Sequence, residues 1–354
     1  MAAQDTPKMR FYQLIGPGPI AQTLKLTTAT RPSTESLERN QVLIEVAVAS
    51  INPADYKIPE LGFVAKTMMP FPKTPGMDFG GRVVAMGPDI PHIKTGDRVI
   101  GRMNPLNSTG SLSEYVVATY DDVAVLPETV PLDQAGAAAT AALTAYQSIV
   151  PFVKMGDKIF INGGSGGTGT FGIQIAKALG CHVTVSCSTA KVSLCRDLGA
   201  DEIIDYKTTD VTAALCGKGK VFALAVDNVG NSPANLFPNT KNFLLSEGKF
   251  KFVGGAVSFG VVKNILPGIL LPSLLGGSNH KFEVFATKNS HEDLAQISAW
   301  MGEGKLKTVI DSTFAFEDVL KAYEKLKQGS SGGKILVRVR EGKHEIGIVR
   351  DELK

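Results

Sequence analysis

The chain has 354 residues, of which 44% are hydrophobic and 20% are charged, and its formal net charge is +3. This length predicts two domains, and the composition is typical of a soluble globular protein. No basic run interleaved with aromatic residues occurs, so a nucleic-acid partner is not expected. The four cysteines form no C-x-x-C pair and residues 1–18 carry no secretory signal, which together predict reduced thiols in a cytoplasmic protein.

The first part of the chain is rich in expected strands. Apolar runs bounded by glycine, proline and asparagine predict strands at residues 41–50, 79–87, 96–101 and 112–118. The pattern changes near Pro127, where an alanine-rich run at 135–150 predicts a helix.

From Lys158 onward, strands alternate with helices, a pattern that indicates right-handed crossovers in a parallel sheet. Further strands are expected at 202–206, 221–227, 249–254 and 282–287, helices at 292–302 and 317–328, and a last strand at 334–339. The fold class is therefore α/β, with a β-rich part followed by a doubly wound parallel sheet.

A glycine-rich turn at residues 159–169 is the most informative feature of the chain. An apolar strand leads into Gly164, Gly166 and Gly169, which fit G-x-G-x-x-G, and a helix and a strand at 181–185 follow. This arrangement places a pyrophosphate on the backbone N–H groups of a helix N-terminus, where the helix dipole favours negative charge. A purely structural loop is the alternative, and the flanking strands favour a dinucleotide site instead.

The end of the next strand indicates which dinucleotide is bound. An NAD site usually has an acidic residue there. This chain has residues 186–191 (Ser-Cys-Ser-Thr-Ala-Lys) instead, and the next acidic residue after them is Asp197. The hydroxyls of Ser188 and Thr189, with the cation of Lys191, could bind a 2′-phosphate. NADPH is therefore expected rather than NADH, although Ser188 could simply cap a helix and Lys191 could be a solvated surface charge.

An apolar segment at 259–277 is nearly long enough to span a bilayer. Lys263, Asn264 and two prolines interrupt it, so a spanning helix is not expected. We expect a wall of the substrate pocket, a lid or a subunit contact, with shallow membrane attachment as the minor alternative.

The order of these motifs resembles that of the medium-chain dehydrogenase/reductase superfamily over nearly the whole chain. The matching landmarks lie at 75–81, 96–99, 110–116, 143–146, 198–201, 227–230 and 332–335. The resemblance implies a GroES-like catalytic domain, made of residues 1–127 and 289–354, around a Rossmann NADP-binding domain of residues 128–288. Relatives of this kind are commonly monomers or homodimers.

Zinc alcohol dehydrogenases of that superfamily hold a catalytic zinc with a cysteine and a histidine. This sequence has Asn52 and Met77 where those two ligands would fall, and residues 101–107 lack the cysteines of a structural zinc site. Zinc prefers cysteine, histidine or carboxylate ligands, so no metal site is expected.

Without a Lewis acid, a conjugated carbonyl accepts hydride most easily, because charge on the enolate oxygen can be stabilised by donors. The segment 52–57 (Asn-Pro-Ala-Asp-Tyr-Lys) resembles that of plant alkenal and chloroplast-envelope quinone reductases, and of fungal trans-acting enoyl reductases that partner with polyketide synthases. The resemblance implies that Asn52 lies beside the nicotinamide and the substrate carbonyl. It implies that Lys57 binds the nicotinamide ribose or acts as a donor to the enolate, and that Tyr56 is a proton or hydrogen-bond donor. Alternatively, Tyr56 is a wall contact, and Asp55 is expected to be a turn or cap residue.

The resemblance also implies the other cofactor contacts. They are Thr144 at the nicotinamide side, Ser165, Gly166, Gly167 and Thr168 on the pyrophosphate, Ser188, Thr189 and Lys191 on the 2′-phosphate, Tyr206 near the adenosine, and Asn228, Val229, Val253 and Gly254 at strand ends facing the cleft. Tyr206 could instead be a surface residue of an edge strand.

The sequence therefore predicts a zinc-independent, NADPH-dependent reductase of an enone, alkenal or quinone. An alternative is a trans-acting enoyl reductase or another tailoring enzyme of a biosynthetic pathway, acting on a large, apolar or carrier-bound enoyl substrate. Two further alternatives are a non-catalytic NADPH-binding protein and a membrane-associated quinone-binding protein.

Overall fold

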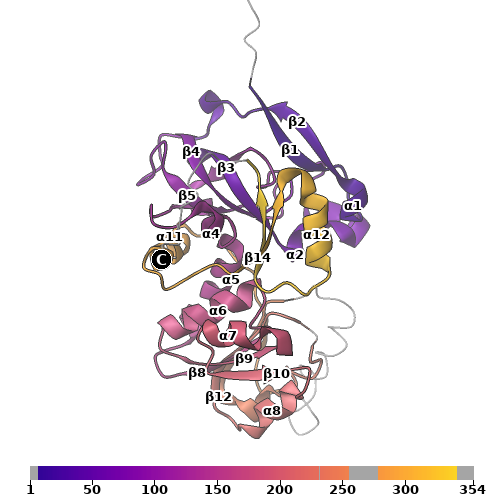
Figure 1. The fold of residues 1–354 in the computed structure, drawn as a ribbon, viewed down its shortest axis with the longest axis vertical. Coiled ribbons are helices and arrows are strands. Elements are labelled where there is room, and N and C mark those ends of the chain that lie inside the picture. Colours follow the sequence, from indigo (N-terminus) through magenta and orange to yellow (C-terminus); the bar gives the residue numbers. More distant parts are fainter. Residues whose placement is uncertain (1–6, 231, 255–277, 341–354) are drawn as a thin grey trace, which may run out of the picture.

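The computed structural model describes residues 7–230, 232–254 and 278–340. The chain forms two lobes, each built on its own β-sheet (Figure 1). The apolar segment predicted at 259–277 lies outside the described residues.

One lobe contains a parallel sheet of six strands in the order β10-β9-β8-β11-β12-β13. The strands are β8 (Lys158–Asn162), β9 (His182–Cys187), β10 (Glu202–Asp205), β11 (Phe222–Asp227), β12 (Leu244–Phe252) and β13 (Phe282–Val284). The helices of this lobe are α6 (Gly167–Ala178), α7 (Val192–Asp197), α8 (Val211–Gly217) and α9 (Thr240–Phe243). The central position of β8 places the glycine-rich turn in the middle of one sheet edge. The alternation of strands and helices predicted from the sequence is confirmed here.

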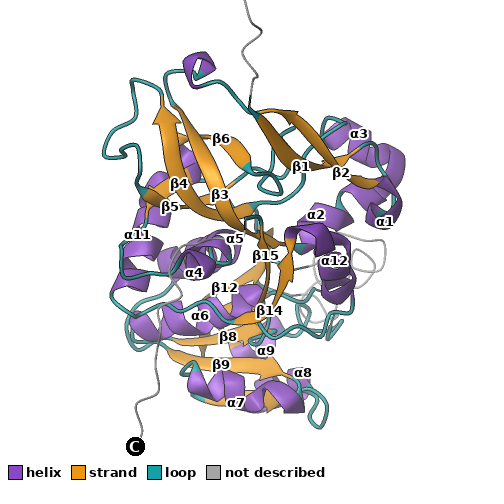
Figure 2. Ribbon diagram, turned by 45° about the horizontal axis from the view of Figure 1, so that its top comes forward, coloured by secondary structure: helices purple, strands orange, loops and turns teal. Residues whose placement is uncertain are grey.

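The other lobe contains a sheet in the order β14-β15-β3-β4-β5-β7, with β6 also paired to β3. Its strands are β3 (Gln41–Ile51), β4 (Asp78–Met86), β5 (Arg98–Arg102), β6 (Tyr115–Thr119), β7 (Val123–Val125), β14 (Ile310–Ala315) and β15 (Lys334–Arg338). The short helices α1 (Ile20–Thr23), α2 (Pro53–Lys57) and α3 (Ala65–Met68) belong to this lobe, as does α12 (Val319–Lys327), and α11 (His291–Gly302) packs against β7 and α5 (Ala139–Ile149) (Figure 2). Since β14 and β15 join the sheet of β3, the end of the chain completes the lobe that its beginning forms.

Four strands of the described residues were not predicted from the sequence. They are β7, β14 and the two strands of the hairpin of β1 (Lys8–Leu14) with β2 (Leu24–Thr30). The helix predicted at 135–150 is divided into α4 (Leu132–Gly136) and α5. The break follows Gly136, where an added Cβ would lie 2.9 Å from the Cβ of Val48, so glycine permits close packing on β3 but weakens the helix.

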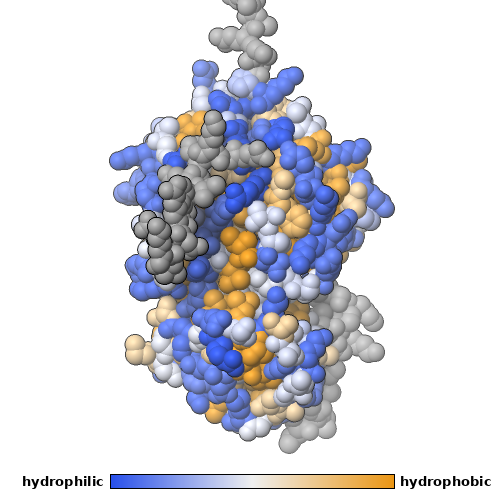
Figure 3. All heavy atoms as spheres, viewed as in Figure 1, coloured by the Kyte–Doolittle hydropathy of each residue, from blue (hydrophilic) through white to orange (hydrophobic). Residues whose placement is uncertain are grey.

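Each lobe has its own buried core. Phe171, Ile173 and Val185 belong to the cluster around the parallel sheet, and Phe79 and Phe316 belong to the cluster around the other sheet. On the face drawn in Figure 3, polar and charged residues predominate, and apolar residues gather in a narrow band along its middle. The domain limits 1–127, 128–288 and 289–354 stay a prediction.

Candidate functional site

A cleft of about 750 Å³ is lined by residues of both lobes. One lobe contributes α2 and the segment that runs from the end of α12 into β15. The other contributes the glycine-rich turn after β8 and the ends of β9, β10 and β11. The carboxyl edge of the parallel sheet therefore faces the catalytic segment predicted from the sequence, which is the place where open α/β sheets bind ligands.

The glycine-rich turn brings backbone N–H groups to the cleft without side chains in the way. Gly163 has a φ of +79°, Gly166 is the N-cap of α6, and the helix begins at Gly167. A Cβ on Gly169 would lie 2.1 Å from the carbonyl oxygen of Gly163, so only glycine fits there. A Cβ on Gly166 would meet nothing closer than 3.6 Å, which leaves open space at the start of the helix. This geometry suits an anionic group of a ligand.

Buried polar contacts below the turn fix its shape. The side chain of Asn162 donates to the carboxylate of Asp227 at 2.8 Å and accepts from the Ser186 hydroxyl at 2.5 Å. Asp227 also accepts from the backbone N–H groups of Val229 and Gly230 at 3.0 Å each. Burial raises the pKa of Asp227. Sequence reasoning gave these contacts no role, although strand-end Asn and Asp residues were a usable signal.

Several predicted cofactor residues line this cleft. They are Lys57, Ser165, Gly166, Gly167, Thr168, Tyr206, Asn228 and Val229. The others do not line it: Thr144, Ser188, Thr189, Lys191, Val253 and Gly254. The structure thus gathers the predicted pyrophosphate residues, whereas the predicted 2′-phosphate residues lie beside the cleft.

The hydroxyls of two of the other predicted residues are bonded within the protein. The Thr144 hydroxyl donates to the Thr140 carbonyl and shares a hydrogen bond with the Thr287 hydroxyl, both at 2.6 Å. The Thr189 hydroxyl donates to Asp205 at 2.6 Å. Protein groups therefore hold both side chains in position without a ligand.

Lys191 reaches toward the opposite lobe. A Cβ on Gly332 would lie 2.6 Å from Lys191 Nζ, so glycine makes room for the ammonium group there. Val253 and Gly254 support the strand end that lines the cleft, because both backbone N–H groups donate to the Asp227 carbonyl at 2.9 Å.

The catalytic segment predicted from the sequence forms the short helix α2, with Asn52 as its N-cap. The carboxylate of Asp55 accepts from the backbone N–H of Asn52 at 2.7 Å, so the prediction that Asp55 is a capping residue is confirmed. Burial raises the pKa of Asp55 to about 7. Asn52, Tyr56 and Lys57 line the cleft, and burial raises the pKa of Tyr56, which keeps its hydroxyl protonated at neutral pH.

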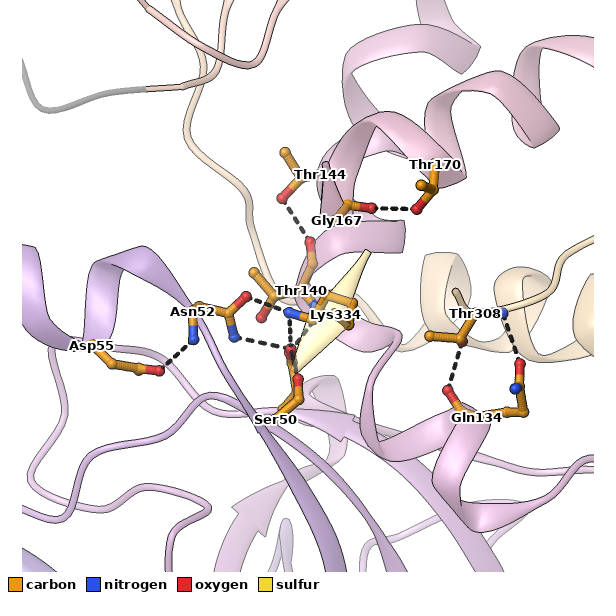
Figure 4. A network of polar contacts seen from close by, with 11 residues as sticks. Ser50, Asn52, Asp55, Gln134, Thr140, Thr144, Gly167, Thr170, Thr308 and Lys334 are labelled. Carbon is orange, nitrogen blue, oxygen red and sulfur yellow. Dashed lines mark hydrogen bonds and ion pairs between the residues drawn. The ribbon is translucent and has the colours of Figure 1, made fainter. Parts of the chain in front are cut away.

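A buried ion pair beside Asn52 was missed from the sequence (Figure 4). Lys334 Nζ lies 3.0 Å from the carboxylate of Asp78, and both side chains are buried. Lys334 also donates to the side-chain carbonyl of Asn52 at 2.6 Å. Although burial disfavours its charge, the Lys334 ammonium and hydrogen bonds from Asn52, Thr140 and Ser50 hold the pKa of Asp78 below its usual range.

Within the described ranges, no group of three or more histidine, cysteine, aspartate or glutamate residues is arranged to hold a metal ion. Asn52 and Met77, which stand where zinc ligands would fall, are both buried, and Met77 offers only a weak thioether ligand. Among the helices of the described parts, none is long and apolar enough to cross a bilayer.

Comparisons with known proteins agree with this architecture. The family model described as alcohol dehydrogenase GroES-like domain matches residues 38–128, and the model described as zinc-binding dehydrogenase matches residues 198–337. A trans-enoyl reductase, pgmF, of Aspergillus terreus is 41% identical over 354 residues, covering 96% of this chain and 99% of that protein.

A chloroplastic quinone-oxidoreductase, QR1, of Triphysaria versicolor is 32% identical, covering 93% of this chain and 98% of that protein. Among solved structures, the quinone oxidoreductase of Coxiella burnetii matches with a TM-score of 0.80 and 28% identity, covering 94% of this chain and 100% of that one. The chain is therefore an oxidoreductase that belongs to the medium-chain dehydrogenase/reductase superfamily, in its quinone oxidoreductase and enoyl reductase group.

Proposed function

We propose that this protein is a zinc-independent, NADPH-dependent reductase of α,β-unsaturated carbonyl compounds or quinones. Membership of the superfamily implies a nicotinamide cofactor. The observation that carries the proposal is that one cleft contains both the glycine-rich turn at 163–169 and the side chains of Asn52, Tyr56 and Lys57. An anionic dinucleotide and an acceptor with a polar oxygen can therefore lie side by side.

When bound, the reduced cofactor would supply the hydride that adds to the β-carbon of the substrate. The electrons of the substrate double bond then move toward the carbonyl oxygen, which becomes an enolate, and a proton adds at the α-carbon. In this proposal Asn52 donates a hydrogen bond to that oxygen, and Lys57 binds the nicotinamide ribose or stabilises the enolate. Tyr56 is protonated and can donate a hydrogen bond, and solvent can supply the final proton.

The choice of NADPH rests on the end of β9. The residues there are Ser186, Cys187 and Ser188, and none of them carries the carboxylate that would repel a 2′-phosphate. We assign the 2′-phosphate to Ser188, Thr189 and Lys191, with Tyr206 beside the adenosine; in this assignment the Thr189 hydroxyl turns from the Asp205 carboxylate to the phosphate. Lys191 lies against Gly332 of the opposite lobe, and this position supports a phosphate site that both lobes enclose.

One comparison favours an enoyl substrate. The relative that is 41% identical across almost the whole of both chains is named a trans-enoyl reductase. An enoyl thioester is a conjugated carbonyl, so the same hydride transfer and the same oxygen donors would serve it. Carrier-bound enoyl groups are therefore the second candidate substrate class.

The test follows the absorbance of reduced nicotinamide with the purified protein. The acceptors are short alkenals, long enones, quinones and enoyl thioesters, each with and without a chelator. The expected result is that one class of acceptor oxidises NADPH and that the chelator does not slow this oxidation. Tight NADPH binding without oxidation by any acceptor would favour a non-catalytic role, and loss of turnover in chelator would contradict the zinc-independent mechanism.

A further inference from the structure

The side-chain amide of Asn52 faces a buried ion pair, whose cation Lys334 is labelled in Figure 4 and whose anion is Asp78. Its oxygen accepts from Lys334 Nζ at 2.6 Å, and its nitrogen donates to the carboxylate of Asp78 at 2.9 Å. The three side chains are nearly inaccessible, with exposed fractions of 6% for Asn52, 4% for Lys334 and 0% for Asp78. Little solvent can therefore compete for these hydrogen bonds.

This arrangement permits only one orientation of the amide. An ammonium group can only donate hydrogen bonds, and a carboxylate can only accept them. Rotating the amide by half a turn would place its NH₂ group against the Lys334 ammonium and its oxygen against the Asp78 carboxylate. Both contacts would then be repulsive, so the ion pair fixes the direction of the amide.

Asp78 is itself held in place by other elements. Its carboxylate accepts from the Ser50 hydroxyl on β3 at 2.8 Å and from the backbone N–H of Thr140 in the first turn of α5 at 2.7 Å. A carboxylate near a helix N-terminus is stabilised by the helix dipole. The anion that orients Asn52 therefore stays charged and stays in position.

The orientation leaves one donor of Asn52 for a ligand. An amide nitrogen carries two hydrogens, and Asp78 accepts one of them. Asn52 lines the cleft, so its second N–H is available on that side. The hydrogen bond from the Lys334 ammonium to the amide oxygen draws electron density away from the nitrogen, which strengthens that N–H as a donor.

We propose that Lys334 and Asp78 are positioning residues, which hold the second N–H of Asn52 as the hydrogen-bond donor to the developing enolate oxygen. This inference rests on the proposed function, because it concerns the oxygen of the same conjugated substrate. It assigns a part in hydride transfer to two residues that act through Asn52: Asp78, which does not line the cleft, and Lys334, which lines it beside Asn52.

A coupling experiment tests whether the pair acts through Asn52. The double variant Asp78→Asn/Lys334→Met removes both charges together, so no unpaired charge is left buried. Its kcat is expected to fall about tenfold to a hundredfold, because a misoriented N–H group of Asn52 stabilises the developing enolate oxygen less well. Its dissociation constant for NADPH is expected to change by less than about threefold, since neither residue is assigned to the cofactor phosphates. The exposed Lys321→Met, on α12, is the matched control for loss of a lysine.

The decisive measurement adds Asn52→Ala to each background. In the wild-type background, Asn52→Ala is expected to lower kcat about tenfold or more, and in the double variant by less than about twofold. The same fold loss in both backgrounds would overturn the inference, because Lys334 and Asp78 would then not act through Asn52. A purely structural role would lower the melting temperature without removing the effect of Asn52→Ala.

A second variant keeps the test decisive where the double variant does not fold. Lys334→Arg retains a cation that donates to the Asn52 oxygen, so it is expected to recover most of the kcat that Lys334→Met loses. Folded Lys334→Arg protein that binds NADPH normally but is as slow as Asn52→Ala would overturn the inference. Wild-type protein that oxidises NADPH with none of the acceptors would instead refute the proposed function.

Discussion

The backbone N–H of Gly333 donates a hydrogen bond to the carbonyl of Ser165 at 3.1 Å. Ser165 belongs to the glycine-rich turn of one lobe, and Gly333 immediately precedes the strand of Lys334 in the other. Gly333 has a φ of +102°, and a Cβ there would lie 2.2 Å from the carbonyl oxygen of Val309, so only glycine permits this contact. The turn proposed to hold the cofactor and the strand that orients Asn52 are thus joined directly.

Gly166→Val tests the pyrophosphate site. The protein itself has room for a side chain at this position, since nothing lies within 3.6 Å of an added Cβ, and its φ of −77° suits any residue. A valine would occupy the space at the start of α6 that we assign to the pyrophosphate. We expect a folded protein whose affinity for NADPH, measured by fluorescence titration, is at least about a hundredfold weaker.

Gly169→Ala is the matched comparison in the same turn. Its Cβ would collide with the Gly163 carbonyl at 2.1 Å, so this variant is expected to lose stability rather than affinity alone. The melting temperature separates the two cases. Normal NADPH affinity in folded Gly166→Val protein would remove the turn from the cofactor site.

Lys191→Ala tests the choice of cofactor. If the ammonium group of Lys191 binds the 2′-phosphate, its loss removes a charge-assisted hydrogen bond that NADH never makes. We expect the dissociation constant for NADPH to rise about tenfold or more, while that for NADH changes by less than about twofold. Lys158→Ala, at the amino end of β8 and so at the opposite edge of the sheet, is expected to alter neither constant. Equal effects of Lys191→Ala on both cofactors would exclude Lys191 from the phosphate site.

The sequence predicted the parts of the site that depend on local pattern. The strand, turn and helix around Gly166 are adjacent in the chain, so spacing alone indicated their geometry. The cap formed by Asp55 on Asn52 is equally local, because only three positions separate them. Strand β14 lacked a comparably clear signal, since its side chains are mostly half-buried and show no regular alternation.

The orienting ion pair could not be predicted in this way. Lys334 lies 282 positions from Asn52 and 256 positions from Asp78, and the pairing of both β15 and β4 with β3 brings them together. Asp78 and Lys334 were visible as parts of the landmarks at 75–81 and 332–335, but a landmark shared with a family does not say what a side chain contacts. To predict a long-range contact of this kind, the register of the sheet must be known.

Asp55→Asn tests a pH dependence of stability that arises at the helix α2. The pKa of this carboxyl group is raised by burial from 3.8 to about 7 in the folded protein. The charged groups that act on it are Asp78 on β4, Lys334 on β15 and Lys73. Between about pH 4 and 7 the folded protein keeps Asp55 protonated while the unfolded chain ionises it, so the folded state binds more protons. The contribution of Asp55 to the free energy of unfolding therefore falls as the pH rises through this window and is constant above it, with a total change on the order of 4 kcal/mol.

Asparagine cannot ionise, but its side-chain oxygen can still accept from the Asn52 N–H. The free energy of unfolding of Asp55→Asn should therefore rise relative to that of the wild type between pH 5 and pH 7, as measured by denaturant titration at several pH values. The comparison ends at pH 7 because burial lowers the pKa of Lys73 to about 8, and this lysine loses the favourable charge of Asp55 in the variant. Asp121→Asn, an exposed residue remote from α2, serves as the control and should give a flat difference. A flat difference for Asp55→Asn as well would mean that Asp55 is ionised in the folded protein throughout this range, and that α2 is capped by a carboxylate rather than a carboxylic acid.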